Sequence, residues 1–143
     1  MPAVDLEVLV AAVITRLGAT LGAAHVFDGE VNAVMDSDGR AHPYAVVHVS
    51  PGNLHSLDLA GIHDVLDWRF QVTAAGGDPS RARRAIVRVR DALTGHDLVV
   101  ASGVVGRVVE DPDYQPGPLR EDRDVAPSRW YAPLQFRLRP TNA

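Results

Sequence analysis

Two segments in which apolar and polar side chains alternate limit the folds open to this 143-residue chain. In residues 65–74 every second residue is apolar, namely Leu66, Trp68, Phe70, Val72 and Ala74. The same alternation returns near the C-terminus, where the apolar positions are Trp130, Ala132, Leu134, Phe136 and Leu138. A strand with this pattern buries one face and leaves the other in water. We therefore expect an antiparallel sheet that is covered on one side, at least over residues 65–74.

A first helix is predicted near the N-terminus. Apolar residues spaced three and four apart, from Leu6 to Leu21, place one stripe on a single helical face. We expect the helix to cover residues 5–18, with Asp5 as its N-cap and Gly18 or Gly22 as its stop.

A second helix is predicted directly after the first alternating strand. Asp78 is a good N-cap, and Pro79 suits the first turn because the N–H that proline lacks would be unpaired there. The expected buried stripe is Ala82, Ile86, Val89 and Leu93. The pair Thr94-Gly95 should end the helix.

Shorter elements complete the order along the chain. Residues 44–49 are rich in β-branched side chains and lie between turn residues, which predicts a strand. Residues 98–101 and 104–109 predict a hairpin around Ser102-Gly103, and residues 36–39 predict a tight turn. Residues 25–28 and 31–35 fit either short strands or loops.

These elements favour one α+β domain over residues 1–143, a mostly antiparallel sheet with two amphipathic helices packed on one face. Pro133 cannot donate a hydrogen bond within a sheet, so we expect the last strand to lie at an edge or to carry a bulge. The apolar run 8–14 is too short to span a bilayer and follows acidic residues, so we expect a soluble protein made in the cytoplasm.

Composition excludes several chemistries. The chain has no cysteine, which excludes disulfides, thiolate metal sites and cysteine nucleophiles. All 14 basic residues are arginine, so a phosphate-loop lysine and a Schiff-base lysine are excluded as well. The formal net charge of −4 disfavours a non-specific nucleic-acid binder. We find no cofactor motif and expect no cofactor.

The histidines offer the best candidates for a small-molecule or metal site. His55, Asp58, His63 and Asp64 lie near one another in sequence, but their spacing matches no metal-ligand pattern. The stretch 36–39 resembles the start of a calcium loop, yet the later ligands of that loop are missing. Polar loop residues and a simple turn are the favoured interpretations, and we expect neither a metal nor catalysis.

Two charged segments of opposite sign stand out. Residues 78–91 carry a net charge of about +3, and Arg81, Arg84 and Arg88 share one helical face. Such a face is either simply solvated or contacts an acidic partner or phosphates. Residues 110–124 carry about −4, inside the stretch 110–128, whose four prolines disfavour regular structure. We therefore predict a long acidic, proline-rich loop there, either functional or ordered by a partner.

The closing third of the chain resembles a known family in its pattern and order. It runs from Val104 to Asp111, then through the charged residues 120–125, and then through the aromatic strand 127–138. Upstream lie an N-terminal helix, a strand ending at Ser50-Pro51-Gly52, and an alternating strand that leads into a second helix. This layout resembles the tail terminator proteins of long-tailed bacteriophages.

The resemblance implies a structural virion protein that forms a ring, commonly a hexamer, capping the tail tube and joining it to the head. The implied partners are further copies of the chain, the tail tube protein and the neck or connector proteins. DNA would pass the lumen without specific binding, and no membrane is involved. The implied location is the tail of the virion, with the host cytoplasm during assembly.

The residues add weaker support of their own. A ring needs head-to-tail contacts that close. We expect the basic helix 78–91 to meet the acidic loop of a neighbour, and the strand 129–138 or the loop 110–128 to reach a neighbour by strand addition or by ordering on contact. The candidate contact residues are Arg81, Arg84, Arg88, Tyr114, Arg120, Asp122, Asp124, Arg129 and Tyr131.

Two other interpretations stay open from sequence alone. The chain also fits a different phage or cellular assembly module, such as a head-closure protein or a minor tail component. A small enzyme or ligand-binding domain is the remaining alternative, and His55, Asp58 and His63 would then be its candidate residues.

Overall fold

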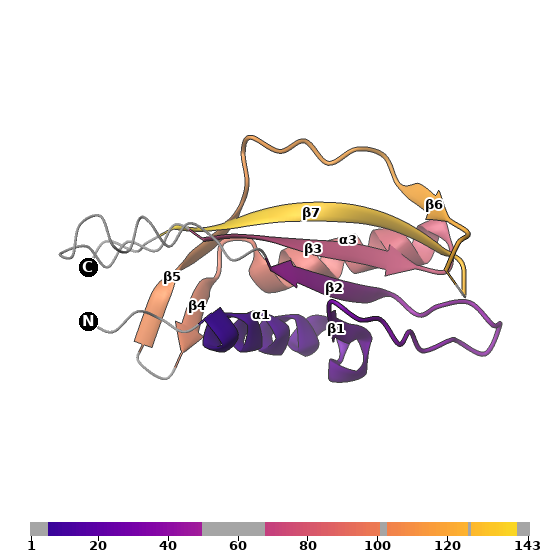
Figure 1. Cartoon of the computed structure of the whole chain (residues 1–143), viewed down its shortest axis with the longest axis horizontal. Helices are drawn as coiled ribbons and strands as arrows, with labels where there is room; N and C mark the ends of the chain where they lie inside the picture. Colours follow the sequence, from indigo (N-terminus) through magenta and orange to yellow (C-terminus); the bar gives the residue numbers. More distant parts are fainter. Residues whose placement is uncertain (1–5, 50–67, 101–102, 126, 140–143) are drawn as a thin grey trace.

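The computed structural model describes residues 6–49, 68–100, 103–125 and 127–139. Within these residues seven strands form one sheet in the order β1-β2-β3-β7-β5-β4, and β6 pairs with β7 off this path (Figure 1). The strands are β1 Val26–Asp28, β2 Tyr44–Val49, β3 Trp68–Gly76, β4 Asp97–Val100, β5 Gly103–Glu110, β6 Arg120–Asp122 and β7 Arg129–Arg139. The helices are α1 Leu6–Leu21, the short 3-10 turn η1 Ala23–His25, and α3 Pro79–Leu93. The fold is α+β, as the sequence predicts.

The two alternating strands lie side by side at the centre of the sheet. β3 and β7 pair antiparallel from Trp68 opposite Leu138 to Gly76 opposite Trp130. This register places the apolar positions of both strands on the face that α1 and α3 cover. The Phe70 and Phe136 rings stack there with centroids 5.6 Å apart. The prediction that the apolar positions of the alternating strands face the core is therefore confirmed. Residues 65–67 of the predicted strand lie outside the described residues.

Helix α1 is longer than predicted. It continues one turn beyond Gly18 because Leu21 is buried in the core, and Gly22 follows with a positive φ of 93°. The side chain of Arg16 donates to the Ala92 carbonyl oxygen at 2.7 Å, and Thr20 donates to that of Arg88 at 2.9 Å. These two bonds join α1 to α3 beside the apolar contacts. The predicted cap, Asp5, lies outside the described residues.

Helix α3 begins and ends where its sequence predicts. The Asp78 side chain accepts a hydrogen bond from the Arg81 N–H at 2.7 Å, and Pro79 opens the first turn. At the other end the Thr94 N–H bonds the Arg90 carbonyl oxygen, and Gly95 has a φ of 77°. The buried residues are Ala82, Ala85, Val89, Ala92 and Leu93, with Ile86 partly buried beside them.

The β4–β5 hairpin, the strand β2 and the turn at residues 36–39 are confirmed. Residues 26–28, which fitted a strand or a loop, form β1, and Met35 makes an isolated bridge with Ala41. β1 pairs with β2 in parallel, so the sheet is not wholly antiparallel. In the described part of the chain, no helix is long and apolar enough to cross a membrane.

The second face of the sheet is partly covered, which corrects the expectation of a one-sided sheet. Tyr44, Val46 and Ala75 are buried on this face together with Ala41 from the preceding segment. Thr73, predicted to face water, is only 5% exposed. Arg69 and Gln71 are more exposed than Thr73. A sheet with one buried and one exposed face is therefore seen only along the first half of β3.

β7 is a central strand and pairs without a register shift, so the prediction of an edge strand or a bulge is wrong. β3 pairs along one side, while β5 and β6 share the other side. Pro133 lies between the stretches that β5 and β6 occupy, and its carbonyl oxygen accepts from the Tyr114 hydroxyl at 3.2 Å. Because N and O of one strand residue point to the same side, the ring nitrogen of Pro133 also faces this gap. The proline is tolerated because no strand requires its N–H there.

The stretch 110–128 is more ordered than its prolines suggest. Residues 120–122 form β6, a short strand that the sequence analysis missed. Residues 111–119 contain no strand or helix. They run beside the part of β7 around Pro133 that pairs with neither β5 nor β6 (Figure 1). The Asp111 N–H donates to the Gln135 carbonyl oxygen at 2.9 Å, which fixes the start of this stretch.

Candidate assembly surfaces

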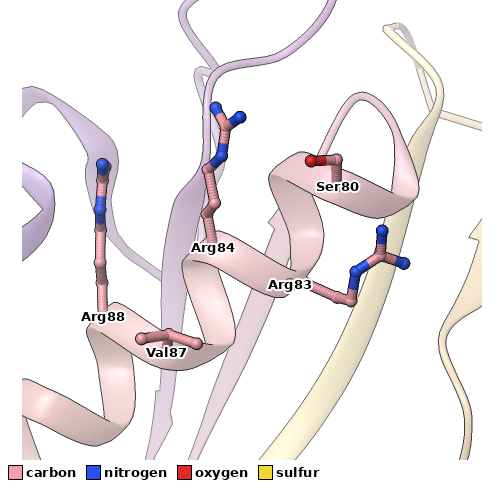
Figure 2. A pocket seen from close by; sticks show the side chains of 5 residues that line it. All are labelled: Ser80, Arg83, Arg84, Val87 and Arg88. Atoms are coloured by element: carbon pink, nitrogen blue, oxygen red, sulfur yellow. The ribbon is translucent and has the colours of Figure 1, made fainter.

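The outward side of α3 carries a shallow hollow of about 300 Å³, which we call the arginine face. Its residues are Ser80, Arg83, Arg84, Val87 and Arg88. Figure 2 shows Arg84 and Arg88 pointing in the same direction, with Arg83 directed to the other flank and Val87 between them. Val87 is 56% exposed and adds an apolar surface to this face. The helix presents this side because its opposite side packs on β3 and α1.

Of the five arginines in α3, three form no ion pair with a carboxylate of the described residues. These are Arg83, Arg84 and Arg88. Arg90 contacts Glu110 at 2.5 Å, and Arg81 is bound by carboxylates. The net charge predicted for the helix is thus concentrated in the three guanidinium groups of the arginine face.

Arg81 ties the turn at residues 36–39 to the start of α3. Its Nε donates to Asp36 at 2.8 Å, one Nη donates to Asp38 at 2.8 Å, and the other contacts Asp78. These bonds raise the pKa of Arg81 and hold the pKa of the Asp36 carboxyl below its ordinary value, with His42 adding a second hydrogen bond. The pKa of Asp78 is lowered chiefly by the Arg81 backbone N–H. Arg81 keeps only 17% of its side chain exposed, so it lies in an internal network beside the arginine face.

Two histidines extend this network. The His25 and His42 rings stack with centroids 4.0 Å apart, and His42 Nδ1 lies 2.9 Å from Asp36 Oδ1. Burial lowers the pKa of His25, and the neighbouring His42 lowers it further. Sequence reasoning gave neither histidine a role, because 17 positions separate them and no spacing rule joins them.

The acidic segment 110–124 is largely neutralised within the chain. Glu110 pairs with Arg90, and Asp111 lies 3.8 Å from Arg69. Glu121 pairs with Arg123 at 2.8 Å, and Asp122 lies 3.7 Å from Arg129. Among the described residues, the carboxylates of this segment that have no ion pair are those of Asp113 and Asp124.

The remaining candidate contact residues gather around β6 and β7. Arg120 lies opposite Tyr131 and Asp122 opposite Arg129 in the antiparallel pair. The Arg129 guanidinium lies 4.9 Å from the Tyr131 ring centroid and 3.4 Å from the Tyr44 hydroxyl. Tyr114 holds the neighbouring stretch through its bond to Pro133. The structure therefore brings Tyr114, Arg120, Asp122, Arg129 and Tyr131 to one margin of the sheet, where β6 pairs with β7, while Arg84 and Arg88 lie on α3.

A second hollow of about 350 Å³ opens at this margin, and sequence reasoning missed it. Segments far apart in the chain line it, namely Val31, Asn32, Ala33, Tyr44, Val125, Pro127 and Arg129. The described residues contain no cluster of three or more potential metal ligands. His55, Asp58 and His63, the candidates for a ligand site, lie outside the described residues.

Comparisons with known proteins find solved structures with a similar fold. No family model matches the chain, and no curated protein matches it. The fold is similar to that of a chain in the solved structure described as "Virion of native gene transfer agent (GTA) particle", with a TM-score of 0.50 and 21% identity over 95% of this chain and 96% of that one. A second solved chain, whose name describes no function, has a TM-score of 0.50 and 20% identity over 97% and 99%. At these identities the comparisons establish a shared fold.

Proposed function

We propose that this chain is a structural virion protein of a tailed phage or phage-like particle. The observation that carries the proposal is the likeness to a chain of a gene transfer agent virion over 95% of this chain and 96% of that chain. Agreement over nearly the whole of both chains indicates that the complete fold, and not a common helix-and-sheet fragment, is shared. A role in assembly, without catalysis, is consistent with this likeness.

The finer proposal is a tail terminator. Copies of the chain form a ring, most simply a hexamer, that caps the tail tube and contacts the neck proteins of the head. The order of elements supports this, with an N-terminal helix, a central alternating strand leading into a second helix, and an acidic stretch leading into the last strand. The chain's net charge of −4 suits a lumen through which DNA passes without being held.

Negative-stain microscopy with purified tail tube protein tests this role. We expect closed rings with a central channel, either free or at one end of each tube, and tubes that stop growing once capped. Rings that bind the head's connector but leave tube length unchanged would indicate a head-closure protein instead. A chain that neither forms rings nor binds tubes or connectors would contradict the proposal.

A further inference from the structure

We propose that the arginine face of α3 is one half of a head-to-tail contact between copies of this chain, and that the acidic segment around Asp113 and Asp124 of the neighbour is the other half. The inference rests on the proposed ring and names the surfaces that join its subunits. Sequence alone pairs the whole basic helix with the whole acidic loop. The structure narrows each side to the charged side chains that have no ion pair among the described residues.

The composition of the arginine face favours a protein partner. Its three guanidinium groups surround Val87, which is 56% exposed. Arginine is enriched at protein–protein contacts, and Val87 adds apolar area between the guanidinium groups. The planar guanidinium also binds carboxylates in a fixed, two-pronged geometry, which suits a specific subunit contact.

Charge complementarity identifies a second copy of the chain as the partner. Arg83, Arg84 and Arg88 lack a carboxylate partner among the described residues, while Asp113 and Asp124 lack a cation there. The acidic side is attached to β7 near each of the two carboxylates, since Tyr114 next to Asp113 bonds to β7 and Asp124 follows the paired strand β6. A carboxylate on an anchored segment loses little conformational freedom when it binds.

The two surfaces lie on different parts of the molecule. The arginine face points away from the sheet on α3, whereas the acidic segment runs along the margin of β7 (Figures 1 and 2). When two copies join through two different surfaces, the first copy still has a free acidic segment and the second copy still has a free arginine face, or the reverse. Such a contact repeats, and it closes into a ring when the rotation between neighbours permits.

Charge reversal on each side tests the contact. The variant Arg84→Glu/Arg88→Glu and the variant Asp113→Arg/Asp124→Arg should each assemble at least about tenfold more weakly than the natural chain, measured by light scattering and sedimentation. Arg107→Glu is the control for charge reversal elsewhere on the surface, because Arg107 lies on β5, and its pair with Asp97 at 3.3 Å is exposed and contributes little to stability. It should assemble normally. Thermal melts of all variants show whether each one is folded.

Mixing the two reversed variants is the decisive experiment. In the mixture, the acidic α3 of one variant meets the basic segment of the other, and the natural α3 meets the natural acidic segment. Assembly should therefore return, although each variant alone assembles weakly. Added salt should weaken the natural contact, since its charges are exposed.

The outcomes separate this inference from the proposed function. Normal rings from the Arg84→Glu/Arg88→Glu variant would overturn the inference and leave the ring proposal intact. Loss of DNA binding by that variant with unchanged rings would assign the arginine face to phosphates and would also overturn it. A folded natural chain that forms no ring, even with tail tubes, would overturn both.

Discussion

Gly76 shows how tightly one residue is constrained where β3 meets α3. A Cβ atom at this position would lie 2.6 Å from the Cβ of Arg81 and 2.7 Å from the backbone N of Ala82. The first turn of α3 therefore packs directly on the strand end. Only a residue without a side chain permits this approach.

We expect Gly76→Ala to lower the free energy of unfolding by about 1 to 3 kcal/mol, because the helix start must shift to admit the methyl group. Urea unfolding followed by circular dichroism measures this. Gly117→Ala is the control: nothing lies within 4 Å of its added Cβ, so its effect should stay within about 0.5 kcal/mol. Equal stability of the two variants would contradict the close approach.

Sequence reasoning at the residue scale succeeds where partners are neighbours in the chain. The Asp78 cap is predictable because its acceptor and donor lie three positions apart. The bond from Arg81 to Asp36 spans 45 positions, and no local rule joins the two. For the same reason the net charge of a segment was predictable, but which of its charges remain unpaired was not.

At the scale of elements, the stretch between β5 and β6 is held by few contacts. Tyr114 supplies one of them through its hydroxyl bond to the Pro133 carbonyl oxygen, and Asp111 supplies another through its backbone N–H. Residues 115–119, which lead from Tyr114 to β6, contain no helix or strand. The order of the stretch therefore depends strongly on these two attachments.

Tyr114→Phe should release this stretch while leaving the sheet in place. We expect a loss of about 0.5 to 1.5 kcal/mol, the range for a single hydrogen bond, with faster amide exchange over residues 111–119. Hydrogen exchange with mass spectrometry resolves the two regions. Exchange that accelerates equally in β3 would show that the bond supports the whole sheet instead.

The main helices and strands could be predicted from the sequence, but which strands pair with one another could not. Alternation identified β3 and β7 because each has one buried face along most of its length. Pro133 indicated an edge, yet the gap that accommodates it is created by β5 and β6, which reach β7 from different parts of the chain. The parallel pairing of β1 with β2 likewise depends on how α1 returns the chain to the sheet, which a single strand's sequence does not encode.

At the scale of the whole molecule, three groups make stability depend on pH in the same direction. The pKa of His25 lies below its ordinary value of 6.5, so the unfolded chain binds a proton there more readily than the folded one. The pKa values of Asp36 and Asp78 lie below 3.8, for which the same holds at lower pH. The lowered carboxyl pKa values stabilise the fold at neutral pH, and this stability is lost on acidification. The lowered pKa of His25 adds no stability at neutral pH, but it makes protonation of the ring destabilise the fold as the pH falls.

We therefore expect the melting temperature to decline as the pH falls below 6.5 and to decline again below 3.8. His25→Phe should remove the first decline, because it keeps a ring against His42 and the buried Nδ1 of His25 has no hydrogen-bond partner to lose. Calorimetry across this range measures both steps. An unchanged first decline in His25→Phe would contradict its assignment to His25.

The gap beside Pro133 also bears on how the chain tolerates changes of length. β5 and β6 are each fixed on β7 by their own backbone pairing, so residues 112–119 need only connect two anchored ends. Doubling the length of such a connection costs only about 0.6 kcal/mol in closure entropy. Insertions after Gly117, where nothing lies within 4 Å of an added Cβ, should therefore be nearly neutral for folding, and a longer connection here would reach further from the sheet.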